Sequence, residues 1–109
     1  MNAVEIRHYV TASGQDPFQQ WLDGLKDLNG RVAIQRRIDR VTNGNFGDHK
    51  FCRDGVWELR IDFGPGYRVY FGREKNSVIL LLCAGSKRTQ SANIKQAVRY
   101  WLDYQRRTR

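Results

Sequence analysis

The chain has little of what metal sites, disulfide scaffolds and membrane anchors require. It contains two cysteines and two histidines in 109 residues, without the spacing of a metal-ligand motif or a disulfide framework. Its longest apolar run, residues 78–84, is far shorter than the roughly 20 residues of a membrane helix. No signal peptide is recognisable. These features predict a cytoplasmic protein with free thiols, no metal, no cofactor and no membrane contact.

The composition is that of a folded, strongly basic domain. Hydrophobic residues make up 40% of the chain and aromatic residues 12%, which predicts one globular domain over residues 1–109. The formal net charge is +8, from 19 basic and 11 acidic residues, and residues 85–109 carry seven of the basic residues against one acid. A basic folded domain favours a polyanionic partner, which is RNA, DNA or an acidic protein.

Hydrophobic periodicity predicts a strand, two helices, a run of strands and a final helix. The opening strand is expected over residues 4–10, and Asp16 and then Asn29-Gly30 are expected to begin the two helices. Strands and their turns fill residues 49–84, residues 85–90 form the loop that leaves the sheet, and Ser91 is expected to cap the final helix. The order predicts an α+β domain, with an antiparallel sheet of four or five strands and with the helices packed on its apolar face.

A polar sheet face is expected around the turn at residues 64–66. Apolar and polar residues alternate on both sides of this turn, and the polar set is Glu58, Arg60, Asp62, Arg68 and Tyr70. We expect the turn to place Asp62 opposite Arg68 and Arg60 opposite Tyr70. Such a face is either solvated, with Arg68 paired to Asp62, or able to hold a phosphate backbone.

Several blocks in this part of the chain resemble the RelE/ParE toxin superfamily, specifically its HigB-like "addiction module killer" branch. They are GVWELRI at residues 55–61, GPGYRVYF at 64–71, LLCAGSKRTQ at 81–90 and IKQA at 94–97, followed by an aromatic helix end. The resemblance spans most of the chain and rests on the combination and order of the blocks. It implies a RelE-like fold, a compact antiparallel sheet flanked by helices.

The resemblance also implies a function and partners. It implies the toxin of a type II toxin–antitoxin module, a ribosome-dependent mRNA endoribonuclease (mRNA interferase) that acts in the 30S A site and cleaves through the 2′-hydroxyl without a metal. A cognate antitoxin is implied too, in a complex that binds its own promoter DNA through the antitoxin. Two alternatives stay open: a ParE-like poison of DNA gyrase, and a non-catalytic basic nucleic-acid-binding domain.

Carried over position by position, the resemblance places Arg60, Arg68 and Lys87 on the active surface. Cleavage through the 2′-hydroxyl needs a base, an offset for the extra charge on phosphorus and an acid for the 5′-oxygen. The fork of arginine donors suits the charge offset, so Arg68 is the first candidate and Arg60 supports it. Lys87 is expected to orient phosphate or exchange a proton. Glu58 is either the base or an ion-pair partner of an arginine.

Five further residues are candidates for contact with RNA, and four of them also have a simpler interpretation. They are Lys50, Tyr70, Arg88, Gln90 and His49. Tyr70 stacks a base or is an ordinary half-exposed strand residue, and Gln90 bonds a base or caps the helix. His49 is a general acid or has no role, and Lys50 contacts phosphate or is solvated.

Two positions depart from the HigB-like pattern. Ser86 and Asn93 stand where that branch commonly has aspartate, so a site shaped by those acids would be altered in this chain. Three arginines of the second helix, Arg36, Arg37 and Arg40, are expected on a solvated face, with binding to ribosomal RNA as the alternative.

Overall fold

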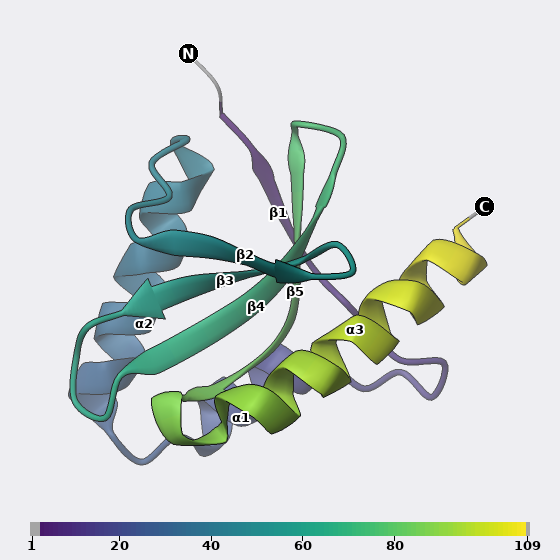
Figure 1. Cartoon of the computed structure of the whole chain (residues 1–109). Coiled ribbons are helices and arrows are strands. Elements are labelled where there is room, and N and C mark those ends of the chain that lie inside the picture. The colour runs from purple at the N-terminus through teal and green to yellow at the C-terminus, as the bar shows by residue number, and fades with distance from the viewer. Residues whose placement is uncertain (1–2, 109) are drawn as a thin grey trace.

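The structure is a computed structural model, which describes residues 3–108 and has the expected α+β fold (Figure 1). The elements in chain order are β1 (Glu5–His8), α1 (Pro17–Gly24), α2 (Leu28–Thr42), β2 (His49–Arg53), β3 (Val56–Ile61), β4 (Tyr67–Glu74), β5 (Val78–Ser86), a 3₁₀ turn η1 (Lys87–Thr89) and α3 (Gln90–Arg107). The two N-terminal helices, the strand run and the C-terminal helix are therefore confirmed. Among residues 3–108, no helix combines the length and the apolar character that crossing a bilayer demands.

The sheet is mixed rather than wholly antiparallel. Its five strands lie in the order β1-β5-β4-β3-β2, and neighbouring strands from β2 to β5 run antiparallel. The first strand pairs with the last one in parallel, with Glu5 opposite Val78 and His8 opposite Leu81. The expectation of an antiparallel sheet was wrong at this edge because α1 and α2 separate β1 from β2, and the chain re-enters the sheet at the other edge.

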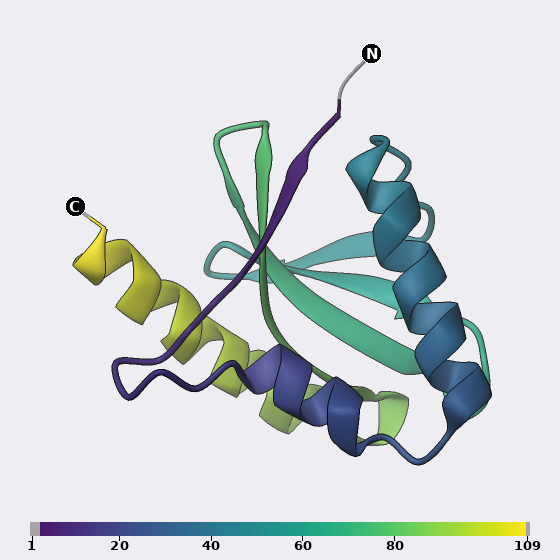
Figure 2. The ribbon, with the colours of Figure 1, turned by 180° about the vertical axis from the view of Figure 1, so that it is seen from behind.

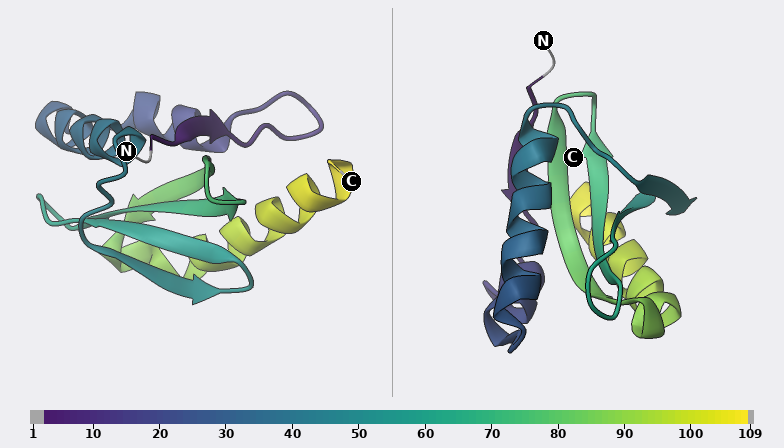
Figure 3. Two further views of the ribbon diagram at one scale, coloured as in Figure 1. Left: turned by 90° about the horizontal axis from the view of Figure 1, so that it is seen from above. Right: turned by 90° about the vertical axis from the view of Figure 1, so that its left-hand side faces the viewer.

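Helices cover both faces of the sheet, which corrects the expectation of one covered apolar face. Figure 2 shows α1 and α2 on one side, and Figure 3 shows α3 on the other. The side toward α3 also presents apolar residues, including Val56 and Leu82, which pack with Ala97, Val98 and Trp101 of α3. The polar face seen in the sequence is therefore only partly open, because α3 shields one end of it.

The start of α2 differs from the expected Asn29-Gly30 cap. Asp27 is the capping residue, and its side chain accepts a hydrogen bond of 2.9 Å from the Gly30 amide. Gly30 belongs to the first turn of the helix, where a β-carbon would lie 2.7 Å from the ring of Tyr67. The Tyr67 hydroxyl donates to Asp27 over 2.6 Å. Gly30 thus serves close packing between α2 and β4 and is not the cap at the start of α2.

The register of β3 against β4 differs from the expected one by two residues, because Arg68 pairs with Arg60 instead of Asp62. Arg60 lies opposite Arg68, Glu58 lies opposite Tyr70, and Asp62 follows the end of β3. The loop between β3 and β4 is longer than expected. Two backbone hydrogen bonds close it as a turn: the Phe63 amide donates to the Ile61 carbonyl over 2.9 Å, and the Gly66 amide donates to the Phe63 carbonyl over 3.0 Å. Side chains alternate with a period of two, so this shift leaves the expected residues on the same face.

Packing between α3 and β4 leads to a stability prediction at Gly72. A β-carbon at this position would collide with the indole of Trp101. Gly72→Ala is therefore expected to lower the free energy of unfolding by about 1–3 kcal/mol, measured by urea denaturation. Gly24→Ala is the matched control, because a β-carbon there meets no other atom within 4 Å. Equal stability of the two variants would contradict this packing.

Candidate nucleic-acid interface

The open part of the polar face lies where β3 ends, β4 begins and α3 starts. Figure 1 shows α3 crossing the sheet, with its first turn near the loop that joins β3 to β4. Arg60 on β3 and Arg68 on β4 are direct cross-strand neighbours here. Like charges in this position repel one another, so the arginine pair Arg60–Arg68 needs a compensating negative charge.

Glu58 supplies that charge to Arg60. Its side chain is 1% exposed, and Arg60 Nε donates to its Oε1 over 3.0 Å. Gln90 Nε2 donates to the same carboxylate over 3.2 Å and 3.0 Å, so Gln90 does not cap the helix. The hydrogen bond to Glu58 is the main cause that raises the pKa of Arg60. Glu58 therefore holds Arg60 in place and favours its charged form. Both carboxylate oxygens of Glu58 already accept hydrogen bonds.

Arg68 lacks such a partner. Its Nη1 donates to the carbonyl of Tyr67 over 3.2 Å, whereas its buried Nε has no hydrogen-bond partner within residues 3–108. None of the ion pairs in the described part of the chain joins Arg68 to Asp62, so the expected neutralising pair is absent there. The residue as a whole is only half-buried and has no carboxylate partner in the described part of the chain, so its guanidinium is suited to an incoming anion.

Lys87 reaches the same place from η1. Its amide donates to the Gly66 carbonyl over 2.6 Å, which ties the start of η1 to the β3–β4 loop. A β-carbon at Gly66 would lie 3.5 Å from Lys87 Cβ and 3.7 Å from Arg68 Nη1, so this loop position lies in contact range of both side chains. Gly66 also has a φ of +79°, which favours glycine. The structure thus brings Arg60, Arg68 and the exposed Lys87 together, as expected; we call them the cation cluster.

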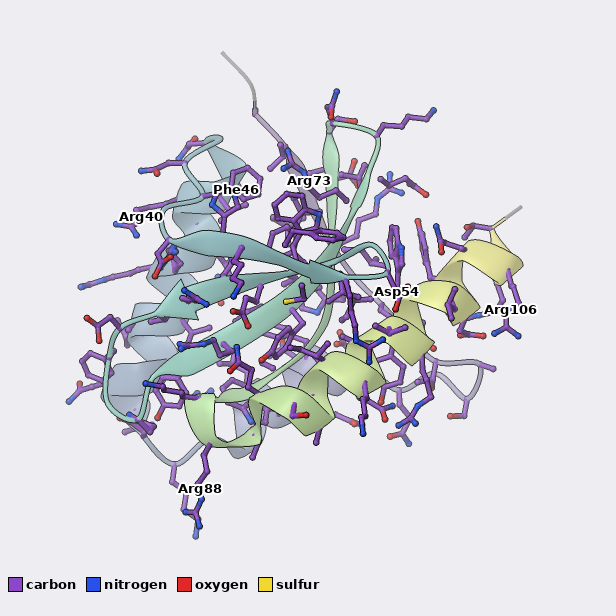
Figure 4. All side chains as sticks on the ribbon, viewed as in Figure 1. Arg40, Phe46, Asp54, Arg73, Arg88 and Arg106 are labelled. Carbon is purple, nitrogen blue, oxygen red and sulfur yellow. The ribbon has the colours of Figure 1, made fainter. Side chains whose placement is uncertain are left out.

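Two of the expected RNA contacts do not belong to this cluster. Tyr70 is 0% exposed beneath α3, so the expectation that it stacks a base was wrong. Burial and the charge of Glu58 raise the pKa of its phenol, which stays protonated. The side chain of Arg88 extends away from the sheet in Figure 4. It is exposed and takes no part in the cluster.

The alternation along β2 separates Lys50 from His49. Lys50 lines a hollow of about 180 Å³ together with Cys52, Glu58 and Gln90, beside the cation cluster. His49 lies on the opposite face, where its ring stacks on Trp57 with 5.8 Å between centroids. Lys50 is therefore placed to contact RNA near the cation cluster, whereas His49 is too remote to act as its general acid.

The two departures from the HigB-like pattern build the loop before α3. Asn93 Oδ1 accepts a hydrogen bond of 2.6 Å from the Thr89 hydroxyl, and it packs against Gly85. The amide of Ser86 donates to the same hydroxyl over 3.2 Å. An additional turn, η1, stands before α3, so Ser91 lies inside the helix and is not its cap.

Arg37 was expected on a solvated helix face, but it is buried and supports the site. It is 7% exposed, and its guanidinium donates to three backbone carbonyls: Phe46 at 2.9 Å, Arg60 at 2.7 Å and Asp48. Burial lowers the pKa of Arg37. The spacing of Ile34, Arg37, Ile38 and Val41 placed it on the buried stripe of α2, so the sequence did carry a signal. Its neighbours Arg36 and Arg40 are exposed, as expected.

The thiol of Cys52 reports on the charge of Glu58. Burial and then this charge raise the pKa of Cys52 to about 11, so little thiolate is present at pH 8. We expect iodoacetamide to label Cys52 about tenfold more slowly than the urea-unfolded chain. Glu58→Gln removes the negative charge, lowers the thiol pKa and should accelerate labelling, followed by peptide mass spectrometry. Cys83 is the internal control because burial alone raises its pKa to about 12; faster labelling of both cysteines would indicate unfolding instead.

The chemistry of the site is that of an anion-binding surface. Within residues 3–108, no group of three or more histidine, cysteine or carboxylate side chains is arranged to hold a metal ion. The available groups are two guanidiniums, an ammonium and a buried carboxylate that is already paired. Such groups bind and polarise a phosphodiester.

Comparison with known proteins places the chain in a family. Residues 20–99 match the family described as phage-derived protein Gp49-like (DUF891). The chain belongs to this Gp49-like family. An uncharacterized protein of Haemophilus influenzae (strain ATCC 51907 / DSM 11121 / KW20 / Rd) is 50% identical over 80 residues, which cover 73% of this chain and 81% of that protein. The span that matches the Gp49-like family begins within α1, ends within α3 and includes the whole cation cluster.

Proposed function

We propose that this Gp49-like chain is the toxin of a type II toxin–antitoxin module and a ribosome-dependent mRNA endoribonuclease. The observation that carries the proposal is the cation cluster, in which the half-buried Arg68 lies opposite Arg60 and has no carboxylate partner within residues 3–108. The resemblance of residues 55–97 to the RelE/ParE superfamily supports it, as does the α+β fold. A gyrase poison has no need for cations grouped on its sheet, so the cluster favours the nuclease.

In the proposed reaction, the cation cluster binds the scissile phosphate and no metal takes part. The 2′-hydroxyl gives its proton to a solvent water as its oxygen attacks phosphorus, and the bond from phosphorus to the 5′-oxygen then breaks. The forks of Arg68 and Arg60 stabilise the additional negative charge of the five-coordinate state. Lys87 donates a proton to the departing 5′-oxygen. Glu58 acts through Arg60, because the carboxylate is enclosed and holds the guanidinium in place. It is thus a positioning residue rather than the base.

The proposal includes protein partners. A cognate antitoxin would silence the toxin by covering or neutralising the cation cluster, with acidic residues or a helix. In this scheme the complex binds its own promoter through the antitoxin, and the toxin supplies the surface for mRNA in the 30S A site.

Inducible expression tests the proposal. The native chain is expected to arrest growth and to produce new in-frame mRNA ends in primer extension, whereas an Arg68→Ala, Lys87→Ala double variant should do neither. Growth arrest by both chains without mRNA cleavage would contradict the nuclease and point to a protein target such as gyrase. Equal expression levels of the two chains are the necessary control.

A further inference from the structure

A row of aromatic side chains crosses the sheet on the face opposite the cation cluster. Phe71 of β4, Trp57 of β3 and Phe51 of β2 are consecutive cross-strand neighbours. The rings of Trp57 and Phe71 are stacked with 6.4 Å between centroids, and Phe51 meets Trp57 edge-on at 5.2 Å. Exposure rises along the row from 0% for Phe71 to 48% for Phe51 at the sheet edge. The row therefore begins in the core and ends in solvent.

Cationic and further aromatic groups complete this surface. The guanidinium of Arg73 lies 4.9 Å from the ring centroid of Phe46 and 5.5 Å from that of Trp57. Figure 4 shows Arg73 and Phe46 gathered above β2. His49 stacks on Trp57 and approaches Phe46 at 5.2 Å. We call the surface formed by Phe46, His49, Phe51, Trp57 and Arg73 the aromatic platform.

The platform carries positive charge that no carboxylate neutralises in the part of the chain that the structure describes. None of the ion pairs there involves Arg73, and the imidazole of His49 contacts only the Gly47 carbonyl among polar groups. Flat rings beside a guanidinium match the bases and the backbone of a single-stranded nucleic acid. Bases stack on aromatic rings irrespective of sequence, and arginine adds an attraction for both base and phosphate.

We propose that the aromatic platform binds unpaired bases of single-stranded RNA. This inference rests on the proposed function and adds a second RNA-binding surface to it. Phe51 is the outermost ring and offers a face to a base, with His49 beside it. Arg73 holds the adjacent backbone phosphate. The platform contributes affinity for RNA and takes no part in the chemistry of cleavage.

The edge strand β2 connects the platform with the cation cluster. His49 and Phe51 face the platform, whereas Lys50 between them lines the hollow with Glu58 and Gln90. An RNA strand that passes over this edge contacts Lys50 on its way from one face to the other. The scissile phosphate and the stacked bases then belong to the same RNA molecule.

Features of β2 argue against an added protein strand at this edge. The ladder between β2 and β3 shifts register between Phe51 and Arg53, and such a bulge interrupts strand pairing. Lys50 and Arg53 are exposed on the edge, and charged side chains discourage edge-to-edge pairing. RNA tolerates both features because it binds by stacking and charge rather than by a backbone ladder.

Binding to a short 2′-O-methyl RNA, which cannot be cleaved through its 2′-oxygen, tests the proposal by fluorescence anisotropy. Phe51→Leu keeps an apolar side chain but removes the ring, and it should weaken binding about tenfold. Phe51→Tyr should bind like the native chain because it restores the ring. Val32→Ala is the control, since Val32 is also 48% exposed but lies on α2 away from the platform.

The outcomes separate this inference from the proposed function. If Phe51→Leu binds RNA as tightly as the native chain while the native chain cleaves mRNA, the platform is overturned and the nuclease stands. If the native chain neither binds the RNA nor cleaves mRNA, both are overturned. If Phe51→Leu loses binding to an antitoxin but keeps its affinity for RNA, the platform binds protein and the inference is wrong.

Discussion

Replacing Arg68 with alanine is expected to lower the rate of mRNA cleavage by roughly 10²–10³-fold, the usual effect of removing one donor to a developing charge. The reason is that the half-buried guanidinium of Arg68 has no carboxylate partner in residues 3–108 and can pair with that charge. Removal should leave the free energy of unfolding nearly unchanged, because the side chain makes one hydrogen bond of 3.2 Å to a neighbouring carbonyl. Single-turnover cleavage on programmed ribosomes measures the rate, and urea denaturation measures the stability.

Arg88→Ala is the matched control for Arg68→Ala. Both changes remove one positive charge, but Arg88 is exposed and extends away from the sheet (Figure 4). Cleavage by Arg88→Ala should stay within a few-fold of the native rate because only long-range electrostatics change. Equal losses in the two variants would show that net charge, rather than the arginine pair, supports the activity.

The largest stability effect is expected at Arg37. Arg37→Ala leaves three carbonyls at the junction of α2, β2 and β3 without their charged donor, and should lower the free energy of unfolding by about 3–5 kcal/mol. Arg37→Lys should not restore this stability, because an ammonium cannot reproduce the planar fork. Urea denaturation at neutral pH measures both variants.

Arg36→Ala provides the comparison for Arg37→Ala. Arg36 is adjacent in α2 but exposed, so its removal should change stability by less than about 0.5 kcal/mol. Since Arg37 holds the Arg60 carbonyl, Arg37→Ala should also reduce cleavage under conditions where the chain is still folded. If Arg37→Ala and Arg36→Ala have the same free energy of unfolding, the structural role of the buried guanidinium is contradicted.

Local chemistry made much of the fold predictable. Asp16-Pro17 was expected to begin α1, and the Asp16 side chain accepts a hydrogen bond of 3.0 Å from the Gln19 amide. Asp-Gly is a sequence signal for a two-residue hairpin turn, and the φ values of Asp54 and Gly55, 51° and 84°, are those that such a turn requires. The parallel edge strand and the position of α3 were not predictable in this way. Periodicity fixes which residues share a face, but not which elements meet.

In the candidate site, too, local features were predictable from the sequence and contacts between distant segments were not. The alternation in β3 and β4 placed Arg60 and Arg68 on one face, although the loop length, and so the register, was misjudged. The enclosure of Glu58 depends on Gln90, 32 residues later, and on the path of α3. The same helix buries Tyr70, which alternation alone placed on an open surface. Contacts between distant segments decided which of the expected residues are accessible.

The most direct test of the central claim is the chemistry of the RNA ends produced by the purified native chain on programmed ribosomes. Attack by the 2′-hydroxyl leaves a 5′-hydroxyl on one fragment and a 2′,3′-cyclic phosphate or 3′-phosphate on the other, and these ends are the predicted result. Arg68→Ala should produce almost none of them. Fragments with a 5′-phosphate and a 3′-hydroxyl, or native ends formed equally by Arg68→Ala, would contradict the assignment of cleavage to the cation cluster.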